Sequence, residues 1–347
     1  MLDLFTPVVD SQNFHHNFKM IMNDKDLKDV INSWLIGFED RDNKFIKEFQ
    51  TTFNSSFWEL YLFACLRNLG FTVDFSHNTP DFVIQTKEQS LIVEAVTTSN
   101  PQNGTPEFDR ERAMREFQEK RQTAQGREKL MKEVVSLATE RISNSFISKS
   151  KKYLDKYSNL DHVKGKPFVL AIGGFEQPLF FMQGVAAIQK VLLGITEAKY
   201  VNSRPQIKYD DSIVKQSSGS SIKIGLFNDD EHKHISAVIF SPIATTGKAR
   251  ALSLRRHKNI FFETYRYNDN GQQGIIDMLP QTKYRESLLD GISIYLNPYA
   301  ENPLDPTLFD NDDIAFHYNK DLSMLKHGFL YRRLVLNGSK EDKNAEL

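Results

Sequence analysis

Three carboxylates, Glu59, Asp81 and Glu94, stand in the most apolar part of the chain, between positions 57 and 96. Every residue from Phe57 to Leu66 except Glu59 is apolar or aromatic, and a helix that is hydrophobic on nearly all sides is normally buried. Burying a charged carboxylate without a partner is expensive. Glu59 therefore requires a cation, a hydrogen-bond network, a metal ion or a raised pKa.

The segments that carry Asp81 and Glu94 are predicted strands. Asp81 opens a short run Asp-Phe-Val-Ile, and Glu94 lies within the apolar run 91–96, both bounded by turn residues. Residues 86–90 between them have the length of a hairpin loop, so antiparallel pairing would bring the two carboxylates together. Two carboxylates at a sheet edge, with a third from a packed helix, form a hard oxygen site that suits Mg²⁺ or Mn²⁺.

The order of helix glutamate, strand, Pro80-Asp81, hairpin and apolar-apolar-Glu94 resembles the core of the PD-(D/E)XK nuclease superfamily. The resemblance implies a restriction-endonuclease-like fold, an α/β architecture with a mixed sheet flanked by helices. It also implies that Asp81, Glu94 and the backbone carbonyl of Ala95 bind the metal. Glu59 would contact the metal through water or orient the nucleophilic water.

The family motif has a lysine two residues after the glutamate, and this chain has Val96 there. Replacement cations occur on the helix or helices predicted over 107–157, where no acid lies between Arg141 and Lys152. Lys149 is the first candidate and Lys152 the second, with Arg141 as a phosphate or carboxylate partner. The alternative stays open that these are surface cations near a helix C-terminus, where the helix dipole favours positive charge.

Further polar residues are candidates for contacts with nucleic acid. Thr97 and Gln102 belong to the polar loop that follows the Glu94 strand, and either would orient water or phosphate. A second stretch forms a basic patch that would hold a phosphate backbone, or is a solvated loop; it comprises Lys248, Arg250, Arg255, Arg256, His257 and Lys258.

Composition excludes several function classes. The net charge of −1 means that any contact with nucleic acid must come from a local patch. The single cysteine, Cys65, excludes disulfide frameworks and thiolate zinc sites and favours a reducing, cytoplasmic setting. The N-terminal residues lack the pattern of a secretory signal, and no run of about 18 apolar residues predicts a membrane span.

Three regions are expected along the 347 residues: an N-terminal helical cap (1–51), the PD-(D/E)XK-like nuclease core (52–195) and a C-terminal α/β extension packed on the core (196–347). Within the core we expect strands at 71–75 and 168–172 and an apolar helix at 180–194 that closes the other face of the sheet. The extension should contain a hairpin of strands 222–227 and 234–241 and another strand at 260–267.

The leading hypothesis is a divalent-metal-dependent nuclease that hydrolyses phosphodiester bonds in DNA, or in RNA. The resemblance implies roles such as restriction or phage defence and, because many relatives cut both strands as dimers, a homodimer. The alternative is a catalytically decayed nucleic-acid-binding or scaffold protein, for which Val96 is the evidence. In a third, purely structural interpretation, Glu59 pairs with Arg67 or Arg141.

Overall fold

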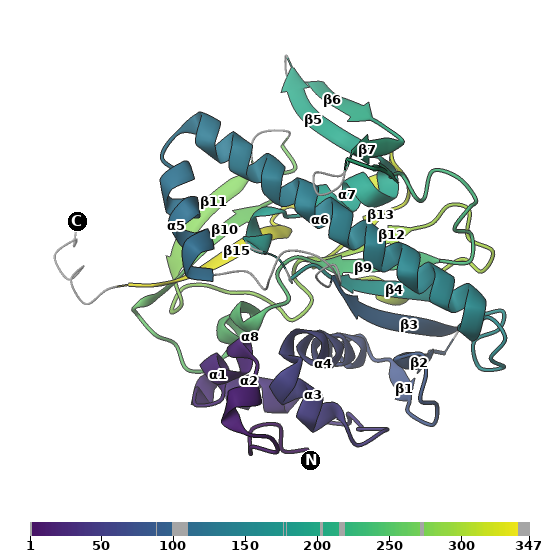
Figure 1. Ribbon diagram of the computed structural model, residues 1–347, viewed down its shortest axis with the longest axis horizontal. Coiled ribbons are helices and arrows are strands. Elements are labelled where there is room, and N and C mark those ends of the chain that lie inside the picture. The colour runs from purple at the N-terminus through teal and green to yellow at the C-terminus, as the bar shows by residue number, and fades with distance from the viewer. Residues whose placement is uncertain are drawn as a thin grey trace.

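The computed structural model describes residues 2–87, 89–98, 110–175, 177, 179–201, 204–214, 219–270 and 274–338. Its centre is an eight-stranded mixed sheet with the strand order β1-β2-β3-β4-β9-β12-β13-β14 (Figure 1). The bounds of these strands are Thr72–Asp74, Phe82–Gln85, Ser90–Thr97, Phe168–Gly173, Ala237–Ser241, Ile292–Leu296, Ile314–His317 and Ser323–Met324. Helices cover both faces, so the chain has the mixed α/β class that the sequence predicts.

Side chains of the central strands alternate between two apolar cores, as the period of two in a β-strand requires. Leu91 and Val93 of β3 pack toward α4 (Phe53–Asn68), whereas Ile92 packs toward α6 (Ala124–Lys152) and α7 (Ala186–Leu193). Figure 1 shows α4 on one side of the sheet and α6 crossing the other. Glu94 shares the parity of Ile92 and therefore lies on the α6 face.

Helix α4 is buried along most of its length, as its apolar sequence predicts. It packs against three N-terminal helices: α1 (His16–Ile21), α2 (Lys25–Trp34) and α3 (Phe45–Thr51). The indole Nε1 of Trp58 donates a hydrogen bond to the carbonyl of Ala171 in β4 at 3.0 Å, which fixes α4 on the sheet one residue before Glu59.

The helix or helices predicted over 107–157 are two in the described part of this segment: α5 (Arg110–Lys120) and the long α6, which ends in a π-helical turn, Tyr153–Tyr157. The predicted helix over 180–194 begins only at Ala186, after a short 3₁₀ turn at Phe180–Met182. Helix α7 lies with α6 on the face opposite α4.

The predicted hairpin of 222–227 with 234–241 is wrong. β8 (Ser221–Lys223) pairs with β7 (Ser212–Val214), while β9 lies between β4 and β12 in the main sheet. All five residues of β9 are buried, which suits a central strand covered on both faces. The main sheet therefore combines strands from both sides of position 195.

The remaining strands form smaller sheets. The strand predicted at 260–267 is confirmed as β10 (Ile260–Arg266), which pairs with β11 (Ile275–Pro280) and β15 (Leu330–Asn337) in a three-stranded sheet. β5 (Ile195–Val201) and β6 (Arg204–Tyr209) form a two-stranded ribbon, which extends away from the main sheet in Figure 1. The short helix α8 (Thr246–Leu252) follows β9.

Candidate functional site

Asp81 and Glu94 are brought together by the antiparallel pairing of β2 with β3, in which Phe82 lies opposite Val93. Asp81, just before β2, accepts a hydrogen bond on Oδ2 from the backbone N–H of Ala95 at 2.7 Å. The N–H and C=O of a strand residue point to the same side, so the Ala95 carbonyl also faces the end of β2. The Asp81 carboxylate and the Ala95 carbonyl thus lie at one point of the sheet, next to Glu94.

The Glu94 side chain, which is 2% exposed, meets cations from α6. Its Oε1 lies 2.6 Å from the Nζ of Lys149 and 3.0 Å from the Nζ of Lys152. Tyr157 donates its hydroxyl to the same oxygen at 3.3 Å. The other oxygen, Oε2, is buried and has no hydrogen-bond partner among the residues that the structure describes. One side of this carboxylate is therefore neutralised and the other still lacks a partner.

The cation that lies beside Glu59 is Arg41, and not Arg67 or Arg141, which the purely structural interpretation of the sequence named. The guanidinium Nη2 of Arg41 lies 3.8 Å from Glu59 Oε1. Through Nη1, Arg41 also donates hydrogen bonds to the backbone carbonyls of His77 (2.8 Å) and Pro80 (3.1 Å). Arg41 thus ties α4 to the loop that carries Asp81, while Arg67 donates to backbone carbonyls at the end of α2 and just beyond it.

Burial and mutual repulsion shift the protonation of two of the three acids. Burial raises the pKa of Glu59 to about 8, with Asp81 adding to the rise and Arg41 opposing it. Burial also raises the pKa of Asp81 to about 6, with Glu94 adding to the rise and Lys149 opposing it. Solvent reaches 23% of the Glu59 side chain, which moderates its shift without reversing the direction. The three acids meet three cations, so the formal charges balance, and burial is the main reason that the pKa values of Glu59 and Asp81 are raised.

The donors at this site fit a divalent cation. Carboxylate oxygens of Asp81 and Glu94 with the carbonyl of Ala95 are the hard ligands that Mg²⁺ prefers, and the buried Oε2 of Glu94 lacks a partner. Within the described part of the chain, no three His, Cys, Asp or Glu side chains already form a metal-binding group. An ion would therefore be held mainly by two carboxylates and a carbonyl, with water completing its shell, as is usual for Mg²⁺.

The C-terminal turn of α6 is held in place by two histidines. Ser150, buried between the two lysines, has its Oγ 2.7 Å from His234 Nε2 and 3.2 Å from His232 Nδ1. His234 stacks on Tyr153, and His232 packs edge-on against Phe146. Burial lowers the pKa of both histidines, which favours their neutral forms. These contacts fix the turn from which Lys149 and Lys152 reach Glu94.

Other residues expected at the site lie elsewhere. Thr97 ends β3, and Gln102 lies outside the described residues. Arg141 is buried on α6, about two turns before Lys149.

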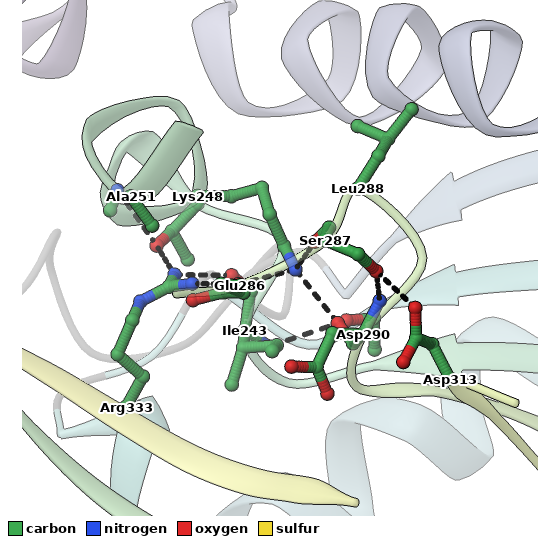
Figure 2. Close-up of polar contacts among 12 residues, drawn as sticks. Ile243, Lys248, Ala251, Glu286, Ser287, Leu288, Asp290, Asp313 and Arg333 are labelled. Carbon is green, nitrogen blue, oxygen red and sulfur yellow. Dashed lines mark hydrogen bonds and ion pairs between the residues drawn. The ribbon is translucent and has the colours of Figure 1, made fainter. Parts of the chain in front are cut away.

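The basic patch predicted around Lys248 and Arg250 needs correction, because neither cation is available to a phosphate backbone. Lys248 is fully buried and pairs with Glu286, which also accepts a hydrogen bond from Arg333 at 2.6 Å (Figure 2). The Lys248 ammonium also donates to the carbonyls of Ser287 (3.0 Å) and Asp290 (2.7 Å). Arg250 pairs with Asp24 at the start of α2. Both residues hold elements together.

Sequence reasoning missed Arg41 and Tyr157. Arg41 lies in a polar loop with no local pattern that marks it, and only the fold brings it to Glu59. Tyr157 carries no helical signal either: at about 100° per residue it would lie about 140° from Lys152 on the predicted α-helix, whereas the chain here forms a π-helical turn. Burial and the nearby Glu94 raise the pKa of Tyr157, so it stays a hydrogen-bond donor.

Comparison with protein-family models, curated protein sequences and solved structures gives no match to this chain. The site must therefore be interpreted from its own geometry. In the part of the chain that the structure describes, no helix combines the length and apolar character needed to cross a membrane.

Proposed function

We propose that the chain is a divalent-metal-dependent nuclease with a restriction-endonuclease-like core, acting on phosphodiester bonds in DNA. The observation that carries the proposal is the environment of Glu94, whose Oε1 meets two lysines while its buried Oε2 has no partner in the described structure, and whose charge acts on Asp81. Burial and the charge of Glu94 raise the pKa of Asp81, and a cation held by both carboxylates would oppose both effects.

In this mechanism, Asp81, Glu94 and the Ala95 carbonyl hold the metal. A bound Mg²⁺ supplies Lewis-acid chemistry, lowering the pKa of water and neutralising phosphate charge. Glu59, with a pKa raised to about 8, is mostly protonated at pH 7, so it would accept a proton from the attacking water only in its ionised fraction, which grows as the pH rises through about 8.

Lys149 and Lys152 supply the positive charge that Val96 cannot. Each ammonium has donors beyond the one directed at Glu94, and Lys152 is 37% exposed, so both are placed to neutralise negative charge on the phosphate in the transition state. The lysine that the family carries on the strand is, in this proposal, replaced by cations from a helix packed on the same face.

The experiment is cleavage of labelled double- and single-stranded DNA in Mg²⁺, Mn²⁺ or EDTA. Asp81→Asn and Glu94→Gln should each abolish metal-dependent cleavage, by at least about 100-fold, because each removes a metal ligand. Asp29→Asn, at an exposed position on α2, is the matched control and should cleave like the unmodified protein. Full activity in Asp81→Asn would refute the proposal, provided that its circular dichroism spectrum shows the native fold.

A second function, a catalytically decayed nucleic-acid-binding protein, is favoured by one observation. Lys149 and Lys152 both pair with Glu94, and Val96 stands where the motif has a lysine. This function predicts DNA binding that is indifferent to EDTA and no cleavage in either metal. The same assay therefore separates the two.

A further inference from the structure

The loop between α8 and β10 presents an exposed leucine among cations. Leu254 is 97% exposed, and Arg255 and Lys258 beside it are also exposed. No Asp or Glu occurs in the sequence from His232 to Phe262. A large apolar side chain held fully in solvent within an acid-free segment is the kind of surface feature that marks an interaction site.

A second loop adds cations to the same surface. Burial and the nearby Arg285 lower the pKa of Arg256, so these two guanidinium groups repel each other. Lys283 lies two residues before Arg285 and is exposed. Among the described residues, no ion pair involves any of the five cations, which we call the basic loop cluster: Arg255, Arg256, Lys258, Lys283 and Arg285.

The fold holds these cations together through specific hydrogen bonds. Gln281 is fully buried; its Oε1 accepts from the N–H of His257 at 3.0 Å, and its Nε2 donates to the carbonyl of Arg250 at 2.8 Å. Arg256 donates from Nη1 to the carbonyl of Ala251 at 2.8 Å. The loop is thus preorganised, and an anionic partner would bind it with little ordering cost.

Two acids that face the loop pair with residues outside the cluster. Asp24 and Asp26 at the start of α2 face the loop, but Asp24 pairs with Arg250, and Asp26 contacts His257 at 2.6 Å. These pairs anchor the base of the loop on the N-terminal helices. Lys283 and Arg285 line a hollow that also contains Asp277, Glu286, Asp290 and Asp313, so the positive charge that remains available is mainly that of Arg255, Arg256 and Lys258.

The cluster and the candidate metal site lie toward the same edge of the main sheet. β3, β4 and β9 are parallel, so their C-terminal ends meet at one edge. Ala95 is near the end of β3, and α8, which leads into the loop, follows the end of β9 (Figure 1). Ligands of α/β sheets commonly bind along this edge.

We propose that the basic loop cluster binds the phosphate backbone of duplex DNA, with Leu254 pressed against the minor groove between two strands of phosphates. The choice of DNA rests on the proposed nuclease function, whereas the choice of a polyanion rests on the charges alone. Arginines bind phosphate oxygens in pairs of hydrogen bonds, and apolar side chains of this size contact or wedge between base steps in the minor groove.

The test is binding of a fluorescein-labelled duplex of about 30 base pairs in EDTA, with the full chain, over a range of salt concentrations. Neutralising three cations with Arg255→Ala/Arg256→Ala/Lys258→Ala should weaken binding at least tenfold. It should also reduce the slope of log K against log salt by about 2–3, because each lost phosphate contact removes about 0.9. Leu254→Ser should weaken binding less and leave the slope unchanged.

The matched control removes the same charge from exposed lysines of the N-terminal region, as Lys19→Ala/Lys44→Ala/Lys47→Ala. A control that weakens binding as much as the loop variant, or a loop variant that binds like the unmodified protein, would overturn the proposal. Binding to phosphatidylserine vesicles is measured alongside. If the loop variant loses binding to the vesicles but still binds DNA like the unmodified protein, the proposal is overturned in favour of a lipid surface. Since EDTA prevents metal-dependent cleavage, the result does not depend on whether Asp81→Asn abolishes cleavage.

Discussion

The protonation of Glu59 and Asp81 links the candidate site to pH. Both pKa values are raised, so the folded protein holds protons that the unfolded chain releases above about pH 4. The folded state therefore binds more protons than the unfolded state between that pH and the folded pKa values of about 6 and about 8. The contribution of these two groups to the free energy of unfolding therefore falls as the pH rises through this window.

Replacing Glu59 by Gln should remove part of this loss of stability at high pH, because Gln cannot become charged when buried. We expect Glu59→Gln to raise the free energy of unfolding by about 1–2 kcal/mol at pH 8.5. It should change that free energy little at pH 4, where the Glu59 side chain is largely neutral and so resembles Gln. Urea titrations at the two pH values measure this. Asp29→Asn should show no such difference, and an equal effect of Glu59→Gln at both pH values would contradict the assigned pKa shift.

At the residue scale, sequence reasoning identified the acids and the cations more reliably than their supports. Glu59, Asp81 and Glu94 stand out because carboxylates are rare in apolar runs, and Lys149 and Lys152 because their helix segment lacks acids. The structure places both lysines on Glu94; their part in catalysis stays a prediction. Arg41 was not predictable, because its contact with Glu59 depends on how a distant loop folds over α4.

Elements were predictable where a local pattern decides them. The apolar period and turn residues identified α4, β2 and β3, and the short loop fixed their antiparallel pairing. The partners of β9 in the sheet were not predictable, because the sequence of a fully apolar strand does not indicate which strands lie beside it. The Lys248 and Arg250 part of the predicted basic patch was wrong for a related reason: charge alone does not reveal that Lys248 pairs with a glutamate 38 residues later.

The last turn of α6 should loosen when its anchor is removed. Ser150→Ala deletes the hydroxyl that meets His232 and His234, so we expect faster amide hydrogen exchange over 146–153. Because the folded-state pKa of both histidines is lowered, this anchor is intact above their unfolded pKa of about 6.5 and weakens as the pH falls below it.

The measurement is hydrogen exchange with mass spectrometry at pH 7.5 and pH 5.5, corrected for intrinsic rates. Protection of 146–153 should fall at pH 5.5 in the unmodified protein and be low at both values in Ser150→Ala. Ser148→Ala, at an exposed position on the same helix, serves as the control. Unchanged protection in Ser150→Ala would show that the histidines do not hold the turn.

At the scale of the whole molecule, a buried ion cluster joins the two larger sheets. Glu286 lies between Lys248 on α8 and Arg333 on β15, and all three side chains are at most 1% exposed (Figure 2). Burial acts to raise the pKa of Glu286, but Arg333 and Lys248 outweigh it and lower the pKa. The three-stranded sheet is therefore fixed to the main sheet partly by charge.

Removing the central carboxylate should destabilise the protein strongly. Glu286→Gln leaves two buried cations without their counter-ion, so we expect a loss of about 3–5 kcal/mol in the free energy of unfolding. Thermal and urea unfolding measure this, with Glu231→Gln, at an exposed glutamate, as the control. A loss below about 1 kcal/mol would mean that water or a rearrangement compensates the two cations.

The position of β4 between β3 and β9 has a consequence for synthesis on the ribosome. Asp81, Glu94, Lys149 and Lys152 are all translated before β4 is complete. The side of β4 that pairs with β9, however, has no neighbouring strand until Ser241 has been translated. During that interval the nascent chain exposes an apolar strand edge able to pair with any extended segment. Chain release at position 195 would make that exposure permanent, so such a fragment should aggregate rather than act as an independent unit.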